Sequence, residues 1–379
     1  MTATDSTESE RLKQRLVSLT RDLILMPSSA ARPEDRQRCY EFIKNHLDAL
    51  DTVEIREYSK NDIPSVIAAP RGCAHPEVLL CGHLDVVAHT DPALFRSRLE
   101  NGRIYGPGAA DMKGPLAIML EIFRHVHTLH PGASLGMAVT ADEESGGEHG
   151  VGYLFNDAGV RCGLAMIPDA GSLNRIAIEE KGILHMRTHS TGRPAHGARP
   201  WAGINPIEIL IARLVALKEG FDAAWPPDNA EDHWHPTCTV TLIGTPNQSV
   251  NAIPAEAEAI LDIRFPAPHT VAEMAQFVNE ILGVDIETTT LIGAEPTHLS
   301  PDETYRKITE EITGEPARFV RGHGGSDARF ICALGIPVLM SRPLSGNLHA
   351  PDEWIDIASM LRFHRIYERY LEHKLRLAL

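Results

Sequence analysis

An unbroken apolar run at Val78–Cys81 constrains the fold of this chain more than any other short stretch. Four consecutive apolar residues followed by Gly82 are typical of a strand that is buried on both faces of a parallel sheet. Helical spacing of apolar residues from Pro115 to Leu129, and further strand-like runs at Leu135–Thr140 and Gly163–Ile167, continue the pattern. This alternation predicts an α/β fold, with a mostly parallel sheet and helices on both of its faces.

A second pattern interrupts the alternation near Gly182. Its strands are predicted at 183–188, 237–244, 256–264 and 285–290, and its helices at 205–219 and 271–282. The order βαββαβ predicts a small ferredoxin-like α+β domain. We therefore expect an α/β domain formed by residues 1–181 and 292–379, interrupted by an inserted domain at 182–291. Residues 221–236, which contain prolines, acids and histidines, are predicted to form a mobile loop.

The composition is that of a globular protein that does not bind nucleic acid. Hydrophobic residues make up 43% and charged residues 23% of the 379 residues, a length that suits two domains. The net charge of −15, without clustered Lys and Arg, argues against nucleic acid as a partner. The six cysteines form no CxxC pair, and the sequence shows neither an apolar signal core nor a membrane-spanning run. We therefore expect free thiols, no membrane association and a cytoplasmic location.

Acidic residues and histidines recur where the predicted strands end. His83 and Asp85 follow the first apolar run, and their spacing of two points both side chains to one side of an extended chain. The other positions are Asp111, Glu143, Glu144, Asp169 and His349. Taken singly, each fits an ordinary helix start, turn or loop. Together they occupy the ends of successive strands, which is the edge where open α/β sheets bind their ligands.

The chemistry of this set indicates a metal site. Two histidines with several carboxylates and no cysteine form a borderline-hard ligand set, which predicts two Zn²⁺ per subunit, with Co²⁺ or Mn²⁺ as substitutes. The glycine-rich segment 106–114, GPGAADMKG, matches neither GxGxxG nor GxxxxGK[ST], so we predict no phosphate loop there.

Five segments resemble, in order and spacing, a known family of dinuclear zinc peptidases and deacylases: GHLDVV, GPGAADMKG, ADEES, PDAG and LHAPDEW. The family includes acetylornithine deacetylase, succinyl-diaminopimelate desuccinylase, aminoacylase and carboxypeptidase G. The resemblance covers nearly the whole chain, including the insert. It implies a zinc-peptidase-like catalytic domain, and an inserted lid domain through which two subunits form a homodimer.

The resemblance also implies a role for each position. The implied metal ligands are His83, Asp111, Glu144, Asp169 and His349. Asp111 would bridge the ions, Asp85 would orient His83, and Glu143 would be the general base toward a water held between the ions. The segment RPAHGARPW implies that His196 reaches the partner's cleft and holds the oxyanion. Other family-like segments imply that the substrate carboxylate or the cleft is contacted by Asn251, Arg264 and Ser326.

Two positions depart from the desuccinylases. Asp169 stands where many deacylases carry Glu, and Lys181 stands where a desuccinylase is expected to carry Arg. We therefore expect a metal-dependent amidohydrolase that acts on an N-acyl amino acid or a related small amide with a carboxylate. A dipeptidase or aminopeptidase of the same family, acting on a short peptide, is the alternative. A second alternative is a metal-dependent binding protein without turnover, which loss of a ligand or of Glu143 would favour, and none is lost.

Overall fold

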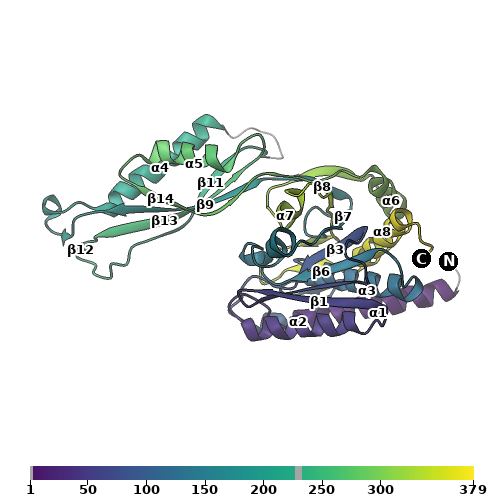
Figure 1. Ribbon diagram of the computed structural model, residues 1–379. Helices are drawn as coiled ribbons and strands as arrows, with labels where there is room; N and C mark the ends of the chain where they lie inside the picture. Colours follow the sequence, from purple (N-terminus) through teal and green to yellow (C-terminus); the bar gives the residue numbers. More distant parts are fainter. Residues whose placement is uncertain (1–2, 227–232) are drawn as a thin grey trace. The chain divides into compact units, whose positions relative to one another are not determined.

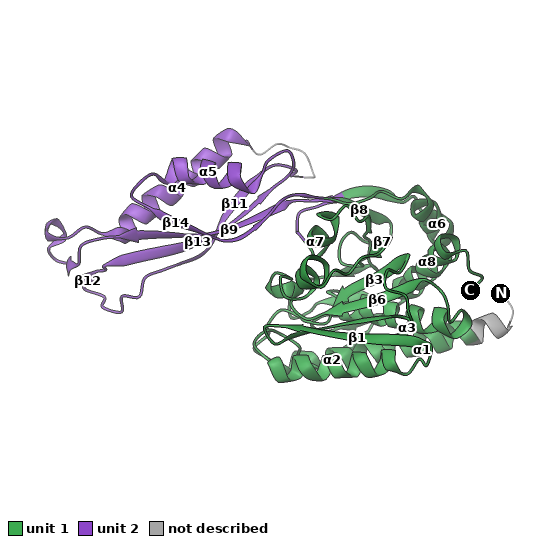
Figure 2. Ribbon diagram, in the orientation of Figure 1, with its two compact units in different colours: residues 1–178, 298–320, 326–379 green, residues 179–297, 321–325 purple. Residues whose placement is uncertain are grey.

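The computed structural model describes residues 3–226 and 233–379. The chain divides into two compact units (Figure 2). Unit 1 consists of Met1–Ile178, His298–Val320 and Ser326–Leu379, and unit 2 of Glu179–Thr297 and Arg321–Gly325. The boundaries expected from the sequence, after residues 181 and 291, lie a few residues away from these. The short segment 321–325 of unit 2 has no counterpart in the sequence prediction.

The main sheet of unit 1 is built around the apolar run at Val78. Its described strands follow the order β1-β2-β6-β3-β7-β17. Their bounds are β1 Val53–Lys60, β2 Ile63–Pro70, β3 Val78–His83, β6 Leu135–Thr140, β7 Leu164–Met166 and β17 Val338–Leu339. Strand β3 is buried throughout and runs parallel to both β6 and β7. In contrast, β1 and β2 form an antiparallel hairpin at one edge, because Asn61 and Asp62 adopt the left-handed conformations of a two-residue turn.

Helices lie on both faces of this sheet (Figure 1), and each face has its own hydrophobic core. The core that contains Leu80 is covered by long helices: α1 Ala3–Ile24, α2 Pro33–Asp48, α3 Lys113–Leu129, α6 Glu303–Thr313 and α8 Ile357–Leu375. Its neighbour Leu79 packs into the other core, as the alternation of side chains along a strand requires. That core is covered by α7 Ala328–Cys332 and the π-helical turn η3 Tyr153–Asp157. Both of these elements are much shorter than the helices that cover the other core.

Short strands form two further small sheets. A sheet of order β18-β19-β5-β4 is formed by β4 Arg98–Glu100, β5 Arg103–Tyr105, β18 Ser345–Gly346 and β19 Trp354–Asp356. It places the segment before Asp111 beside the segment after His349, since Tyr105 pairs with Trp354. The other elements are β8 Arg175–Glu180, β15 Thr297–His298 and β16 Arg318–Gly322, which form one sheet, and the turns η1 Pro92–Phe95 and η2 Glu143–Ser145.

Unit 2 has the ferredoxin-like arrangement that its sequence pattern predicts. Its antiparallel sheet follows the order β11-β13-β9-β14, formed by β9 Gly182–Thr191, β11 Thr237–Gly244, β13 Glu256–Phe265 and β14 Glu287–Ala294. Helices α4 Pro206–Ala224 and α5 Val271–Leu282 lie side by side on one face (Figure 1). Buried side chains such as Met186, Leu261 and Val278 fill the space between helices and sheet. A small ladder of β10 Ala195–His196 and β12 Ala252–Ile253, with the turn η4 Pro200–Ala202, completes the described elements.

The predicted loop at 221–236 is wrong at its start. Residues 221–224 form the last turn of α4, because Phe221 packs in the core of unit 2. Residues 227–232 lie outside the described residues. Across the described ranges, no helix has the length and apolar character that a bilayer crossing requires.

Candidate metal centre and active site

The ends of three parallel strands bring four of the predicted residues together in unit 1. His83 is the last residue of β3, Glu143 and Glu144 form η2 after β6, and Asp169 follows β7. Gly146 and Gly147 both have positive φ angles, which let the chain turn back directly after the glutamates. The remaining two residues come from loops: Asp111 precedes α3, and His349 lies between β18 and β19.

These side chains form two adjacent groups. In each group the candidate ligand atoms lie within 4.8 Å of one another: His83 with Glu143 and Asp169, and Asp111 with Glu144 and His349. Asp111 joins the groups, because Oδ1 lies 3.2 Å from Nε2 of His83 and Oδ2 lies 3.3 Å from Nε2 of His349. Nε2 of His349 also lies 3.4 Å from Oε2 of Glu144. The structure thus brings all six predicted residues into one cluster.

Asp85 supports this cluster in two ways. Its main-chain oxygen lies 3.0 Å from Nδ1 of His83, whereas its carboxylate lies 3.5 Å from the same nitrogen. The carboxylate accepts the main-chain N–H groups of Glu143 at 3.2 Å and Glu144 at 3.0 Å. Asp85 therefore orients the imidazole chiefly through its main chain, and its side chain holds the turn that carries both glutamates.

The histidines and Asp111 alter one another's protonation. Burial alone would lower the pKa of His83, but hydrogen bonds to Asp111 and Asp85 raise it well above its usual value. Burial alone would raise the pKa of Asp111, but contacts with His349 and His83 lower it. Hydrogen bonds to Asp111 and Glu144 raise the pKa of His349 to about 10. Each imidazole is therefore stabilised in its charged form by carboxylates of this cluster.

The other two carboxylates are shifted in the opposite direction. Burial, followed by the charge of Asp169, raises the pKa of Glu143 well above its usual value. Burial and the charge of Asp111 raise the pKa of Asp169 to about 7. Carboxyl groups with raised pKa values are suited to exchange protons near neutral pH.

The cluster fits two divalent cations. Its imidazole nitrogens and carboxylate oxygens are ligands that Zn²⁺, Co²⁺ and Mn²⁺ accept, and Asp111 offers one oxygen to each group. In addition, Oε1 of Glu144 is buried without a hydrogen-bond partner in the described structure. A buried carboxylate oxygen is ordinarily paired or bound to a cation, so this atom is available as a ligand.

Two of the predicted substrate-contacting residues lie close together in unit 2. His196 is the last residue of β10, and the N–H of the following Gly197 donates to the main-chain oxygen of Asn251 at 2.6 Å. Both His196 and Asn251 are exposed. Nδ1 of His196 accepts the N–H of Ala198 at 3.1 Å, so the neutral ring carries its proton on Nε2.

The other two residues predicted to contact the substrate have local partners. Arg264, on β13 of unit 2, donates to both carboxylate oxygens of Asp262, at 2.6 and 3.2 Å. Ser326, in unit 1, is buried, and its Oγ accepts the N–H of Ala328 at the start of α7. Lys181 of unit 2, the departure from the desuccinylases, donates to the main-chain oxygens of His233 and His235 at 2.9 and 2.8 Å.

Sequence reasoning missed three residues that support the candidate metal cluster. Glu353 accepts main-chain N–H groups around Asp111, and burial raises its pKa to about 7. Lys113, which is buried, donates to the main-chain oxygens of Leu23 and Met26. Arg342 donates to the main-chain oxygen of Asp169 at 3.1 Å. Two of them could have been suspected from the sequence, because Lys113 and Glu353 each lie within four residues of a predicted ligand.

A serine-hydrolase pattern also occurs in the sequence, at Gly132–Gly136, GASLG. A nucleophile elbow needs its serine on a turn that follows a strand and opens a helix. Ser134 instead precedes β6, and its Oγ accepts the N–H of Glu77 at 2.9 Å. Ser134 therefore does not lie on a nucleophile elbow, and its hydroxyl instead binds the main chain just before β3.

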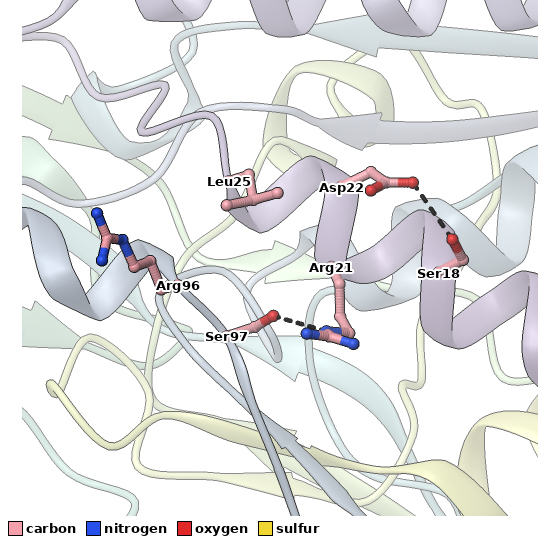
Figure 3. A pocket seen from close by; sticks show the side chains of 6 residues that line it. All are labelled: Ser18, Arg21, Asp22, Leu25, Arg96 and Ser97. Carbon is pink, nitrogen blue, oxygen red and sulfur yellow. Dashed lines mark hydrogen bonds between the residues drawn. The ribbon is translucent and has the colours of Figure 1, made fainter.

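A separate pocket lies on unit 1 (Figure 3). It is lined by Ser18, Arg21, Asp22, Leu25, Arg96 and Ser97. Arg21 donates to Oγ of Ser97 at 3.1 Å, and Oγ of Ser18 donates to Asp22 at 3.4 Å (Figure 3). None of the residues predicted from the sequence lines this pocket, and its polar groups largely bond to one another.

Comparison with known proteins gives one family and a consistent set of relatives. Residues 79–373 match the sequence profile of peptidase family M20/M25/M40. A succinyl-diaminopimelate desuccinylase from Nitrosococcus oceani is 30% identical over 325 residues, which cover 80% of this chain and 85% of the relative. A second one, from Xylella fastidiosa, is 29% identical and covers 94% of this chain and 98% of its own.

Solved structures with the same fold include peptidases. An M20-family metallo-carboxypeptidase from Sulfolobus solfataricus is similar with a TM-score of 0.80 at 18% identity, covering 96% of this chain and 99% of that chain. A tripeptidase from Staphylococcus aureus has a TM-score of 0.76 at 20% identity, with the same coverage. At these identities the likeness shows a shared fold, an α/β domain with an inserted domain.

Proposed function

This chain belongs to peptidase family M20/M25/M40, and from that premise we propose that it hydrolyses the amide bond of an N-acyl amino acid or a related small amide with a carboxylate. The observation that carries the proposal is the position of Asp111, whose two oxygens lie 3.2 and 3.3 Å from the two histidines. The desuccinylase names of the relatives favour an N-acyl substrate over a peptide.

The residues would hold the two ions as follows. His83, Asp169 and Asp111 would bind one Zn²⁺, and Asp111, Glu144 and His349 the other, with Co²⁺ or Mn²⁺ as substitutes. When bound, the ions would polarise the amide carbonyl and acidify a water molecule. The arrangement is supported by the two groups of ligand atoms and by the unpartnered oxygen of Glu144.

Glu143 would transfer the proton. It shares a group with His83 and Asp169, and its pKa is raised by burial and by Asp169. It would take a proton from the attacking water and return it to the departing amine. Asp85 would hold the main chain from which the Glu143 side chain extends.

His196, Asn251, Arg264 and Ser326 would contact the substrate. His196 would donate Nε2–H to the oxyanion, a role that suits the tautomer set by Ala198. Arg264 and Asn251 would bind the substrate carboxylate. Because Arg264 pairs with Asp262, a substrate carboxylate would have to compete with that side chain for the guanidinium.

Two subunits would form a homodimer through unit 2. Strand β11 lies at an edge of its sheet, so its outer main-chain groups are available for pairing. Val240, Leu242 and Ile243 of this strand are exposed, with Leu242 67% exposed. The helix that contacts β11, α4, exposes Ile211 and Val215. Exposed apolar side chains along a sheet edge support this face as the one that pairs with a second copy.

A substrate screen tests the proposed function. The zinc- or cobalt-loaded protein is assayed with N-acetyl and N-succinyl amino acids and with dipeptides, with protein treated with a chelator as the control. Preferred turnover of an N-acyl amino acid supports the proposal. Preferred turnover of dipeptides would show the dipeptidase alternative, and metal binding without any turnover would show the binding-protein alternative. Full activity after complete metal removal would exclude the two-metal site.

A further inference from the structure

Glu353 links the two loops that carry Asp111 and His349. Its side chain is buried, with 1% of its surface exposed. One carboxylate oxygen, Oε1, accepts the main-chain N–H groups of Ala110 at 2.7 Å and of Asp111 itself at 2.9 Å. A hydrogen bond from the main chain of Gly108 adds a third donor. Three donors of the Asp111 loop therefore converge on one side chain.

The main chain of Glu353 is fixed independently of its side chain. Its main-chain oxygen accepts the N–H of Gly106 at 2.9 Å, and the next residue, Trp354, pairs with Tyr105 in the β19–β5 ladder. The guanidinium of Arg103 lies 3.7 Å from the centre of the Trp354 ring. These contacts fix the main chain from which the Glu353 carboxylate reaches residues 108–111.

The same segment positions the second histidine. His349 lies four residues before Glu353, and its backbone φ of 63° is a left-handed conformation that is uncommon for a residue other than glycine. The N–H of Glu353 donates to the oxygen of Ala350 at 3.1 Å, and Asn347 donates to Asp352 at 2.7 Å. The segment 347–353 is thus a hydrogen-bonded loop whose last residue contacts the Asp111 loop.

We propose that Glu353 is a positioning residue for metal binding: by accepting the N–H groups of Ala110 and Asp111, it sets the Asp111 carboxylate between His83 and His349. This inference rests on the proposed metal-dependent function. The essential property of Glu353 is an acceptor oxygen at the end of a side chain of this length. Its negative charge and its volume are secondary.

Three variants separate these properties. Glu353→Gln keeps the length and one acceptor oxygen but loses the charge. Glu353→Met keeps a similar volume but has no oxygen acceptor. Glu353→Asp keeps the charge but is shorter, so it reaches the N–H groups poorly. Glu273→Met is the control, because Glu273 also accepts a main-chain N–H group, that of Thr270, but does so at the exposed start of α5 in unit 2.

Zinc affinity, measured by competition with a chelator, is the main readout, together with kcat, KM and the melting temperature of the metal-free protein. Loss of a residue that orients a metal ligand lowers metal affinity by about 10–100-fold, so we expect this loss in Glu353→Met and a smaller one in Glu353→Gln. In Glu353→Met, kcat should fall more than KM rises. In Glu273→Met, zinc affinity, kcat and KM should stay near those of the unaltered protein.

The outcomes are distinguishable. If the unaltered protein binds no zinc, the proposed function fails. If it binds zinc and Glu353→Met binds equally tightly, the inference about Glu353 fails. It also fails if Glu353→Gln loses as much affinity as Glu353→Met, because charge would then be the essential property. If Glu353→Met does not fold, Glu353→Asp decides, since unaltered zinc affinity in that variant would overturn the proposal.

Discussion

Oδ2 of Asp85 lies 3.0 Å from the main-chain nitrogen of Glu144. Its other oxygen, Oδ1, lies 3.2 Å from the nitrogen of Glu143, and its main-chain oxygen lies 3.0 Å from Nδ1 of His83. Asp85 is buried, with 1% of its surface exposed. A single residue therefore fixes two of the proposed metal ligands, His83 and Glu144, and the proposed general base relative to one another.

Asp85→Asn should lower kcat by about 10–100-fold, the usual cost of losing support behind a metal ligand. The amide can accept one N–H but would direct its own NH₂ group at the other. Asp91→Asn is the matched control, since Asp91 accepts the N–H of Ala93 at the exposed turn η1 and should tolerate the change. Steady-state kinetics on zinc-loaded protein provide the measurement. An unaltered kcat for Asp85→Asn would contradict the prediction.

The two adjacent glutamates should respond differently to the same substitution. Glu143→Gln should keep both metals and lose about 10²–10⁴-fold in kcat, the contribution typical of a general base. Glu144→Gln should instead lower metal occupancy, because it removes a charged ligand of the Asp111 group. Metal analysis and kinetics of both variants provide the check. If Glu143→Gln loses metal and Glu144→Gln keeps it, the two roles are reversed.

Stability after metal removal should decrease as the pH rises. Hydrogen bonds to Asp111 and Glu144 raise the folded-state pKa of His349 to about 10, above its ordinary value of 6.5. A raised pKa gives stability that is complete below pH 6.5 and is lost as the pH rises through 10. Urea unfolding of chelator-treated protein between these pH values measures the effect. His349→Gln should show a weaker decrease, and an equal decrease would argue against this origin.

His196 tests whether two subunits share an active site. His196→Ala should keep metal content and dimerisation and lower kcat by about 10²–10³-fold, the cost of losing one oxyanion donor. Its KM should rise less than its kcat falls. Mixing inactive His196→Ala with inactive Glu143→Gln, and allowing subunits to exchange, should restore part of the activity if His196 acts on the partner. Confirmed exchange without recovery would show that it does not.

The sequence predicted the parts of the fold that depend on local patterns. The apolar run at Val78–Cys81 correctly predicted a buried strand flanked by parallel neighbours, and the βαββαβ order correctly predicted the sheet of unit 2. The antiparallel hairpin of β1 and β2 was not predicted. Its two turn residues are Asn61 and Asp62, and neither is the glycine that usually marks such a turn in a sequence. The end of α4 was missed because the residues after Phe221 are rich in prolines and acids, and the packing of Phe221 in the core of unit 2 cannot be read from the sequence.

The cluster of six side chains could be predicted because each lies at the end of a strand or beside a helix start. Their supports could not be predicted in the same way. Ala110 and Glu353 are 243 positions apart, and the bond between them involves a main-chain donor that has no sequence signature. Likewise, the partner of Arg264 is Asp262 on the same strand, a contact that depends on which rotamer the guanidinium adopts. The cytoplasmic location, the homodimer and the identity of the metal stay predictions.

The buried ammonium of Lys113 has a consequence for how much of the chain is needed for catalysis. It lies two residues after Asp111 and donates to the main-chain oxygens of Leu23 and Met26, while Oγ of Ser28 donates to the main-chain oxygen of Leu84 beside His83. The family profile begins at residue 79. A protein trimmed to that profile would leave a buried positive charge without its acceptors, which is among the most costly defects in a protein interior. The N-terminal segment therefore supports the start of α3, directly after Asp111, and a protein trimmed to the family profile would lose that support.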